Sequence, residues 1–197
     1  MAYTVTATNA IMGPADWYLG AFGATEPDPS TVNSTPQASA WTPLGGTSEG
    51  TTLSFNQTIA QLMMDQTAYV VGSQVAKIEA TAVTQLAEPT LANIQYALNG
   101  GAIATGSGGG VNYATFDPPA DSAVFRPTYV ALLVHGWAPS SAAGVSKRRM
   151  FVLRRVLSVS TGIALPYAKD KQTLIPVTFG IHYVSQSTKP FRIFDEQ

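Results

Sequence analysis

The chain has 197 residues, of which 45% are hydrophobic and only 12% charged, with no cysteine and a net charge of −1. This length fits one domain with a sizeable core. The absence of cysteine excludes disulfide scaffolds, thiolate metal sites and thiol nucleophiles. The longest nearly apolar run, residues 129–134, is too short to cross a bilayer, so no membrane insertion is expected.

The scarcity of charge also has a positive implication. Charged residues are depleted in the cores of protein–protein interfaces. We therefore expect partner molecules to cover much of this surface. A Thr- and Ser-rich β-domain that stays monomeric is the alternative.

The N-terminal half predicts strands separated by one long loop. Residues 16–24 predict a strand, and the Pro-rich segment 26–40 predicts a loop or an extended arm. Residues 51–59 alternate between an apolar side (Leu53, Phe55, Ile59) and an uncharged polar side (Thr52, Ser54, Asn56, Thr58), which predicts a half-buried strand. Residues 70–86 predict one or two further strands, with Glu79 and Thr81 on a polar side.

One helix is clearly signalled after residue 87. Pro89 suits the first helical position, and Glu88 places a carboxylate at the positive end of the helix dipole. Leu91, Ile94 and Leu98 recur at helical spacing, and Gly100 predicts the end of the helix.

The C-terminal half predicts mostly strands. Residues 100–119 predict a long flexible region whose glycine run at 106–110 is a hairpin tip. Strands are predicted at 125–134, at 147–159 with both faces apolar, and at 172–185 with alternating side chains. The side chains of 172–185 that are expected to face the core are Ile175, Val177, Phe179, Ile181 and Tyr183, and those expected to face outward are Thr178, Gly180 and His182. The tail 189–197 is short and amphipathic. The sequence therefore predicts a mainly β chain with one helix.

Charge divides unevenly along the chain. Residues 1–125 carry nine acidic side chains and one basic, a net of −8, whereas residues 126–197 carry ten basic and three acidic, a net of +7. The densest basic stretch contains Arg148, Arg149, Arg154 and Arg155. Intermolecular ion pairs with the acidic half are the preferred interpretation, and a nucleic-acid patch is the alternative.

A search for catalytic chemistry finds no constellation. The only histidines, His135 and His182, have no Asp or Glu neighbour at metal-ligand spacing. The glycine run at 106–110 lacks the Lys-Ser/Thr of a phosphate-binding loop. Asp117 and Asp121 are four residues apart, but in a Pro-rich loop. The sequence therefore predicts no enzyme, no cofactor and no metal.

Four stretches together resemble the major tail tube proteins of long-tailed (siphovirus-type) bacteriophages, especially those of actinobacterial hosts. They are AIMGPADWYLGAFGATEP at 10–27; WTPLGGTSEG at 41–50, leading into the strand 51–57; LAEPTL at 86–91 with ALNGG at 97–101; and IPVTF at 175–179, continuing to KPFRIFD at 189–195. The resemblance spans nearly the whole chain in the expected order.

This resemblance implies a mainly β fold, a β-sandwich or barrel-like tail tube domain over residues 1–197 with a flanking helix. The candidate arms are 26–40, 100–119 and 189–197. It implies hexameric rings that stack into a hollow tube of the virion, assembled in the host cytoplasm. The implied partners are further copies of the chain, a tape measure protein in the lumen, tail terminator and tail-tip proteins, and duplex DNA that passes without specific binding. No cofactor is implied.

Two sets of site residues follow from this interpretation. Contacts between subunits or rings are expected at Arg148, Arg149, Arg154, Arg155, Glu26, Asp28 and Arg192. The lumen is expected to be lined by Thr52, Ser54, Asn56, Thr58, Glu79 and Thr81, because a conduit without free basic side chains would not hold phosphate. Segment 26–40 is expected to be mobile in the free subunit and ordered in the tube.

Two other classes stay open. A capsid decoration protein would share the β-rich, cysteine-free, charge-poor composition. A carbohydrate-binding β-sandwich would need an exposed aromatic platform, for which Trp17, Trp41 and Trp137 are the tryptophans present.

Overall fold

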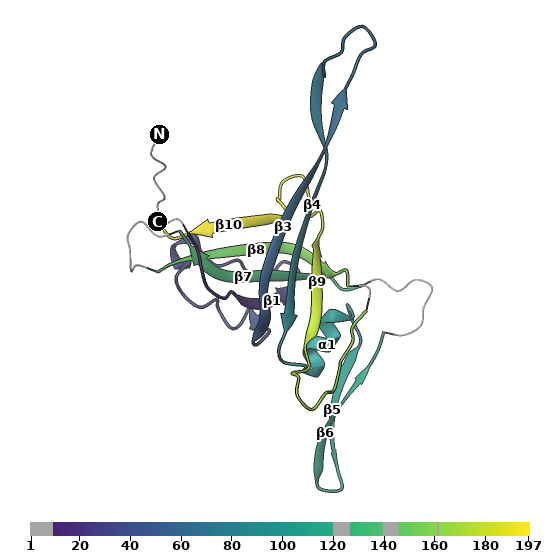
Figure 1. Ribbon diagram of the computed structural model, residues 1–197. Helices are drawn as coiled ribbons and strands as arrows, with labels where there is room; N and C mark the ends of the chain where they lie inside the picture. The colour runs from purple at the N-terminus through teal and green to yellow at the C-terminus, as the bar shows by residue number, and fades with distance from the viewer. Residues whose placement is uncertain (1–9, 120–126, 140–145, 161) are drawn as a thin grey trace.

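The computed structural model describes residues 10–119, 127–139, 146–160 and 162–197 (Figure 1). The chain is mainly β with one short helix, as the sequence predicts. The larger antiparallel sheet has the strand order β2 (Thr42–Pro43), β1 (Asp16–Ala21), β7 (Val130–Ala138), β8 (Lys147–Ser158), β9 (Ile175–Ile181), β4 (Gly72–Leu86) and β3 (Thr47–Leu62). Strand β10 (Phe191–Asp195) also pairs with β8. The second sheet is the hairpin of β5 (Ala102–Gly108) and β6 (Val111–Asp117).

The larger sheet bends over itself at β8. The first part of β8 pairs with β7 and β10, whereas its last residues, 156–158, pair with β9. Strands β3, β4 and β9 consequently cross over β7, β8 and β10, as in a sandwich (Figure 1). The main core fills the space between the two layers, and its largest buried side chains include Trp17, Leu86, Leu132, Leu153, Ile175 and Phe179.

A second core lies on the opposite face of β7 and β8. There Leu133, Met150 and Val152 are buried beneath Val32 and Trp41, which belong to the segment between β1 and β2. The prediction that strand 147–159 has two apolar faces is therefore confirmed. The first two residues of the predicted strand 125–134 lie outside the described residues, and β7 begins at Val130.

The predicted helix exists but begins later than expected. Helix α1 covers Leu91–Ala97, and its N-cap is Thr90, whose side chain accepts a hydrogen bond from the Asn93 amide. Pro89 therefore precedes the helix. The carboxylate of Glu88 accepts from the Gly46 amide (2.8 Å), so the predicted role at the helix dipole is wrong.

Two hairpins leave the body of the molecule in different directions (Figure 1). Strands β3 and β4 pair from Thr47↔Leu86 to Leu62↔Gly72, far beyond the predicted strand 51–59. Residues 100–119 form the hairpin β5–β6 where the sequence predicts a flexible region. Gly109 and Gly110 make its tight turn at φ 59° and 78°, a left-handed conformation that favours glycine.

The other two candidate arms pack on their own chain. Segment 26–40 covers the second core through Val32, and most of the tail 189–197 forms β10 on β8. What either segment does in an assembly stays a prediction. Among the described residues, no helix has both the length and the apolar character needed to span a membrane.

Candidate functional site

The six predicted lumen residues lie on one face of the hairpin β3–β4. Directly paired residues of an antiparallel sheet project to the same side. The register pairs Ser54 with Thr81 and Asn56 with Glu79, and Thr52 and Thr58 follow the same alternation on β3. The sequence placed these residues on two separate strands, and the structure joins them into a single polar surface, which we call the polar face.

The polar face carries almost no free charge. Its charged side chains are Lys77 and Glu79, which form an exposed ion pair (2.5 Å). Thr178 and Gly180 of β9 continue the same face, because they pair with Val83 and Thr81 of β4. On the opposite face of these strands, the paired side chains of Ala82 and Phe179 pack in the main core.

Strand β3 is an open edge of the larger sheet. Among the described residues it pairs only with β4, which leaves the backbone polar groups of its other edge unpaired along Thr47–Leu62. The strand contains no proline, and Glu49 at a bulge is its one charged residue. Proteins usually protect long edges with charge, proline or a covering segment, because such edges pair readily with other strands.

The hairpin also exposes apolar side chains where it leaves the body. The side of β3 that contains Leu53 continues with Phe55 and Ile59, and Val75 and Ile78 lie on the same side of β4. These four apolar side chains are all exposed. The expected half-burial of strand 51–59 is therefore wrong beyond Leu53. Neighbouring exposed apolar side chains are typical of interaction sites, of ligand-binding grooves and of surfaces prone to aggregation.

Two of the predicted contact arginines form ion pairs inside their own chain. Arg149 pairs with Asp195 of β10, and Arg154 pairs with Glu26 through two parallel hydrogen bonds. The bond to Glu26 raises the pKa of Arg154, and the bond to Asp195 raises that of Arg149. Charge reversal at either arginine would thus disturb the subunit itself, and a role between rings stays a prediction.

The other two arginines lie over aromatic rings. The guanidinium of Arg148 is 4.0 Å from the centre of the Trp137 ring, and that of Arg155 is 3.9 Å from the centre of the Tyr129 ring. Arg155 also donates to the Tyr183 carbonyl (2.9 Å). These contacts hold both arginines within the subunit.

Asp28 and Arg192 complete the predicted contact set. Asp28 caps the short 3-10 helix Pro29–Thr31, and hydrogen bonds from Ser30 lower the pKa of its carboxyl group. Arg192 is exposed on β10 and has no ion pair with any described residue, although its guanidinium lies 4.8 Å from the centre of the Phe194 ring. Arg192 is therefore the predicted contact arginine that is most available to a partner.

The histidines have structural surroundings. His135 is buried with Nε2 2.9 Å from the Val32 carbonyl, and burial lowers its pKa. His182 lies edge-on to Tyr129, and burial of its ring also lowers its pKa. No group of three His, Asp or Glu side chains that could hold a metal occurs among the described residues. Asp121 lies outside them.

No protein-family model matches the chain. A search of curated proteins finds none that is similar to it.

The sequence does not predict the outer part of the hairpin. Residues 60–69 fall in no predicted element, yet residues 60–62 end β3 and residues 63–69 belong to its connection to β4. The signal that could have found it is the lack of Gly and Pro between Thr51 and Val71, which allows two long strands to pair without interruption.

Proposed function

We propose that this protein is the subunit of a phage tail tube, in which hexameric rings stack into a hollow conduit for DNA. The observation that carries the proposal is the polar face beside the open edge of β3. A ring in which β3 pairs with a neighbouring copy would satisfy the unpaired edge and place six polar faces side by side.

The chemistry of the polar face supports its position in the lumen. A duplex that must pass through a tube should meet hydroxyl and amide groups, since lysine and arginine contacts to phosphate would retain it. Lys77 is offset by Glu79 in the same subunit. The tape measure protein would occupy this lumen before the DNA, and tail terminator and tail-tip proteins would close the two ends in the virion.

The glycan-binding alternative is disfavoured by the tryptophans. Trp17 and Trp41 are each 1% exposed and belong to the two cores. Trp137 is covered by Arg148. A carbohydrate platform needs exposed aromatic faces, and no tryptophan of this chain supplies one. A capsid decoration protein stays the second candidate within virion proteins.

Negative-stain electron microscopy of the concentrated protein at moderate salt tests the proposal. We expect rings or hollow tubes with six-fold symmetry. Trimeric particles alone would favour a decoration protein, and only monomers in the presence of a tail-tip initiator would contradict the tube.

A charge scan tests which face lines the lumen. The triple variant S54K, N56K and T58K adds positive charge to the polar face. We expect its tubes to retain duplex DNA that unmodified tubes release, because of the phosphate contacts. The matched control S107K, N112K and T115K adds the same charge to the exposed hairpin β5–β6. Equal DNA retention by both variants would show that the polar face lies elsewhere.

A further inference from the structure

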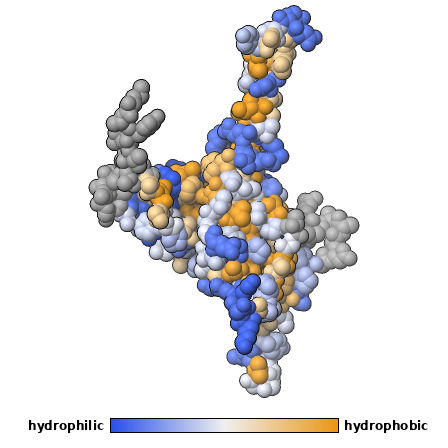
Figure 2. Space-filling view, in the orientation of Figure 1, coloured by the Kyte–Doolittle hydropathy of each residue, from blue (hydrophilic) through white to orange (hydrophobic). Residues whose placement is uncertain are grey.

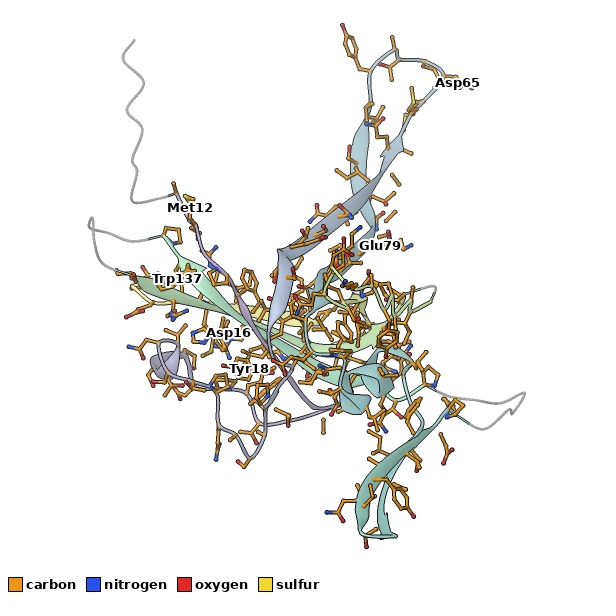
Figure 3. All side chains as sticks on the ribbon, turned by 60° about the horizontal axis from the view of Figure 1, so that its bottom comes forward. Met12, Asp16, Tyr18, Asp65, Glu79 and Trp137 are labelled. Carbon is orange, nitrogen blue, oxygen red and sulfur yellow. The ribbon has the colours of Figure 1, made fainter. Side chains whose placement is uncertain are left out.

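The end of the long hairpin exposes large apolar side chains beside a single charge. The connection between β3 and β4 exposes Met63 (65%), Met64 and Tyr69 (82%). Asp65, labelled in Figure 3, is the only charged residue between Gly50 and Ala76. Figure 2 shows the hairpin as a projection from the body, with orange, hydrophobic patches along its length and blue, hydrophilic residues at its far end. We call residues 63–69 the hairpin tip.

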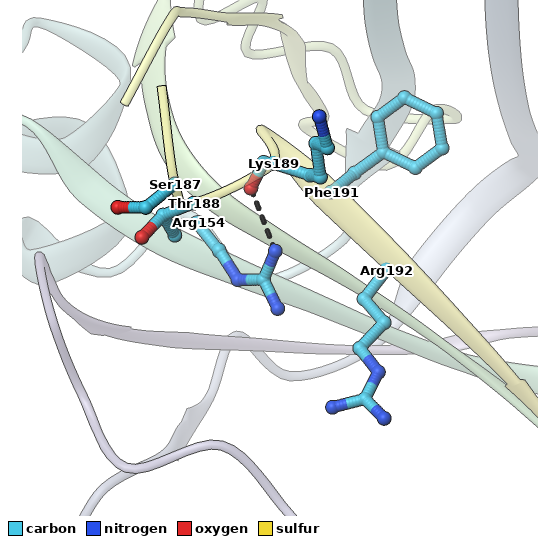
Figure 4. A pocket seen from close by; sticks show the side chains of 6 residues that line it. All are labelled: Arg154, Ser187, Thr188, Lys189, Phe191 and Arg192. Atoms are coloured by element: carbon cyan, nitrogen blue, oxygen red, sulfur yellow. Dashed lines mark hydrogen bonds between the residues drawn. The ribbon is translucent and has the colours of Figure 1, made fainter. Parts of the chain in front are cut away.

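A groove of complementary chemistry lies on the body of the same chain. Its apolar half is a cavity of about 170 Å³ whose lining includes Phe22, Trp41, Val152 and Val184. Its basic half is a hollow of about 440 Å³ lined by Ser187, Lys189, Phe191 and Arg192 (Figure 4). Arg154 and Thr188 border both halves, so the two hollows are adjacent, and together we call them the docking groove.

The docking groove keeps a net positive charge. Arg154 is neutralised by Glu26 and also donates to the Lys189 carbonyl (2.7 Å; Figure 4). Lys189 and Arg192 are exposed, and neither forms an ion pair with a described residue. The Asp28 carboxylate is held by two hydrogen bonds from Ser30 and forms no ion pair with Arg192. Lys189 and Arg192 can therefore still bind a further carboxylate.

The hairpin tip cannot reach the groove of its own chain. Phe55 at the foot of the hairpin contacts Phe191 of the groove, with ring centres 4.8 Å apart. From Phe55 to Leu62 strand β3 rises about 3.3 Å per residue, so the tip, which follows Leu62, lies more than roughly 20 Å from the groove. Any tip that fills the groove must come from another copy.

We propose that the hairpin tip of one copy docks in the docking groove of a second copy. The carboxylate of Asp65 lies between Lys189 and Arg192, and Met63 or Met64 enters the apolar half. Methionine suits such a cavity because its flexible, polarisable side chain fills irregular gaps. The contact joins different surfaces of identical chains, so it is heterologous and can continue from ring to ring as an open stack. This inference rests on the proposed function and specifies which surfaces meet.

Engineered cysteines test the contact directly, since the chain has none of its own. The variants D65C and R192C are purified separately, mixed and oxidised mildly. We expect a disulfide-linked dimer of one D65C chain and one R192C chain, which runs as a dimer without reductant. The matched control pairs R192C with S107C, whose cysteine is also exposed, on the hairpin β5–β6, and should give no such dimer.

A charge exchange provides a second test of the docking. D65R should lower the assembled fraction about tenfold through like-charge contact, and D65R combined with K189E and R192E should restore it. Circular dichroism checks that each variant is folded.

The outcomes separate this inference from the proposed function. Crosslinked chains together with tubes support both, and crosslinked chains in particles that are not tubes support the docking alone. If tubes form, no D65C–R192C dimer appears and D65R assembles normally, the docking proposal is wrong and the proposed tube function is retained. The absence of both the dimer and any tube overturns the docking as well.

Discussion

Arg149 and Asp195 show at the scale of single residues how the tail is held on the body. Their ion pair fastens β10 to β8 at the last paired position of the two strands, Asp195↔Arg149. The hydrogen bonds from Arg149 lower the pKa of Asp195. A carboxylate with a lowered native pKa stabilises the fold above its unfolded pKa, about 3.9, and loses this contribution as the pH falls through the native pKa.

We therefore predict a stability loss in acid that depends on this pair. D195N should lower the free energy of unfolding by about 1–2 kcal/mol at pH 7 and should flatten its decline below about pH 4. Urea denaturation between pH 2 and 7 measures both effects. The control introduces D195N into an R149Q background, where the slope should hardly change. A D195N profile parallel to that of the unmodified protein would contradict the prediction.

The arginines also show that the sequence alone does not predict which ion pairs form within the subunit. The uneven division of charge predicts ion pairs between the acidic and basic halves, and Glu26–Arg154 is such a pair. The sequence cannot tell an intramolecular pair from an intermolecular one, because the difference depends on whether segment 26–40 folds back on the sheet. In the subunit, segment 26–40 does fold back on the sheet, since Val32 lies buried in the second core.

At the scale of elements, Asn99 joins the end of α1 to the end of β8. Its side-chain amide donates to the Ser158 carbonyl (2.6 Å), and its side-chain oxygen accepts from the Ser158 amide (2.7 Å). Its backbone is left-handed, with φ 60°. Asparagine tolerates this conformation better than most residues, whereas alanine in it is less stable by about 1–2 kcal/mol because of backbone strain.

Two substitutions separate these contributions. N99G removes the side-chain hydrogen bonds but keeps the favourable backbone, so we expect a loss of about 1–3 kcal/mol in the free energy of unfolding. N99A should lose about 1 kcal/mol more because of its backbone strain. Urea denaturation of both variants measures the difference. Equal stability of N99A and N99G would show that the left-handed conformation is not retained.

Elements whose side chains face a core are the ones that the sequence predicts well. Ile175, Val177 and Phe179 alternate into the main core as expected, because a buried face imposes the period of a strand. Tyr183, assigned to the same buried face, is exposed beyond the end of β9. The outer β3–β4 hairpin was missed for a related reason. Ile59, Leu62 and Val75 are exposed there, so no buried face in the subunit imposes the alternation that marks a strand.

The whole molecule divides into a body that contains both hydrophobic cores and projections that bury few side chains. Beyond Thr58 and Lys77, the hairpin β3–β4 has no buried side chain. Its exposed apolar residues cost the isolated subunit hydration free energy that only a partner can offset. This division predicts that the outer hairpin serves assembly and that the fold does not require it.

A shortened chain tests this division. Residues 59–76 are replaced by Asn-Gly, which forms the tight turn that suits two paired strands. We expect the free energy of unfolding to change by less than about 1 kcal/mol, since no core contact is removed. Assembly should be lost, which sedimentation velocity would show as a monomer at concentrations where the unmodified protein forms particles. The control shortens β5–β6 by replacing residues 104–115 with Asn-Gly. If the variant without 59–76 unfolds, the hairpin belongs to the fold, and if it still assembles like the unmodified protein, the surfaces that join the copies lie on the body.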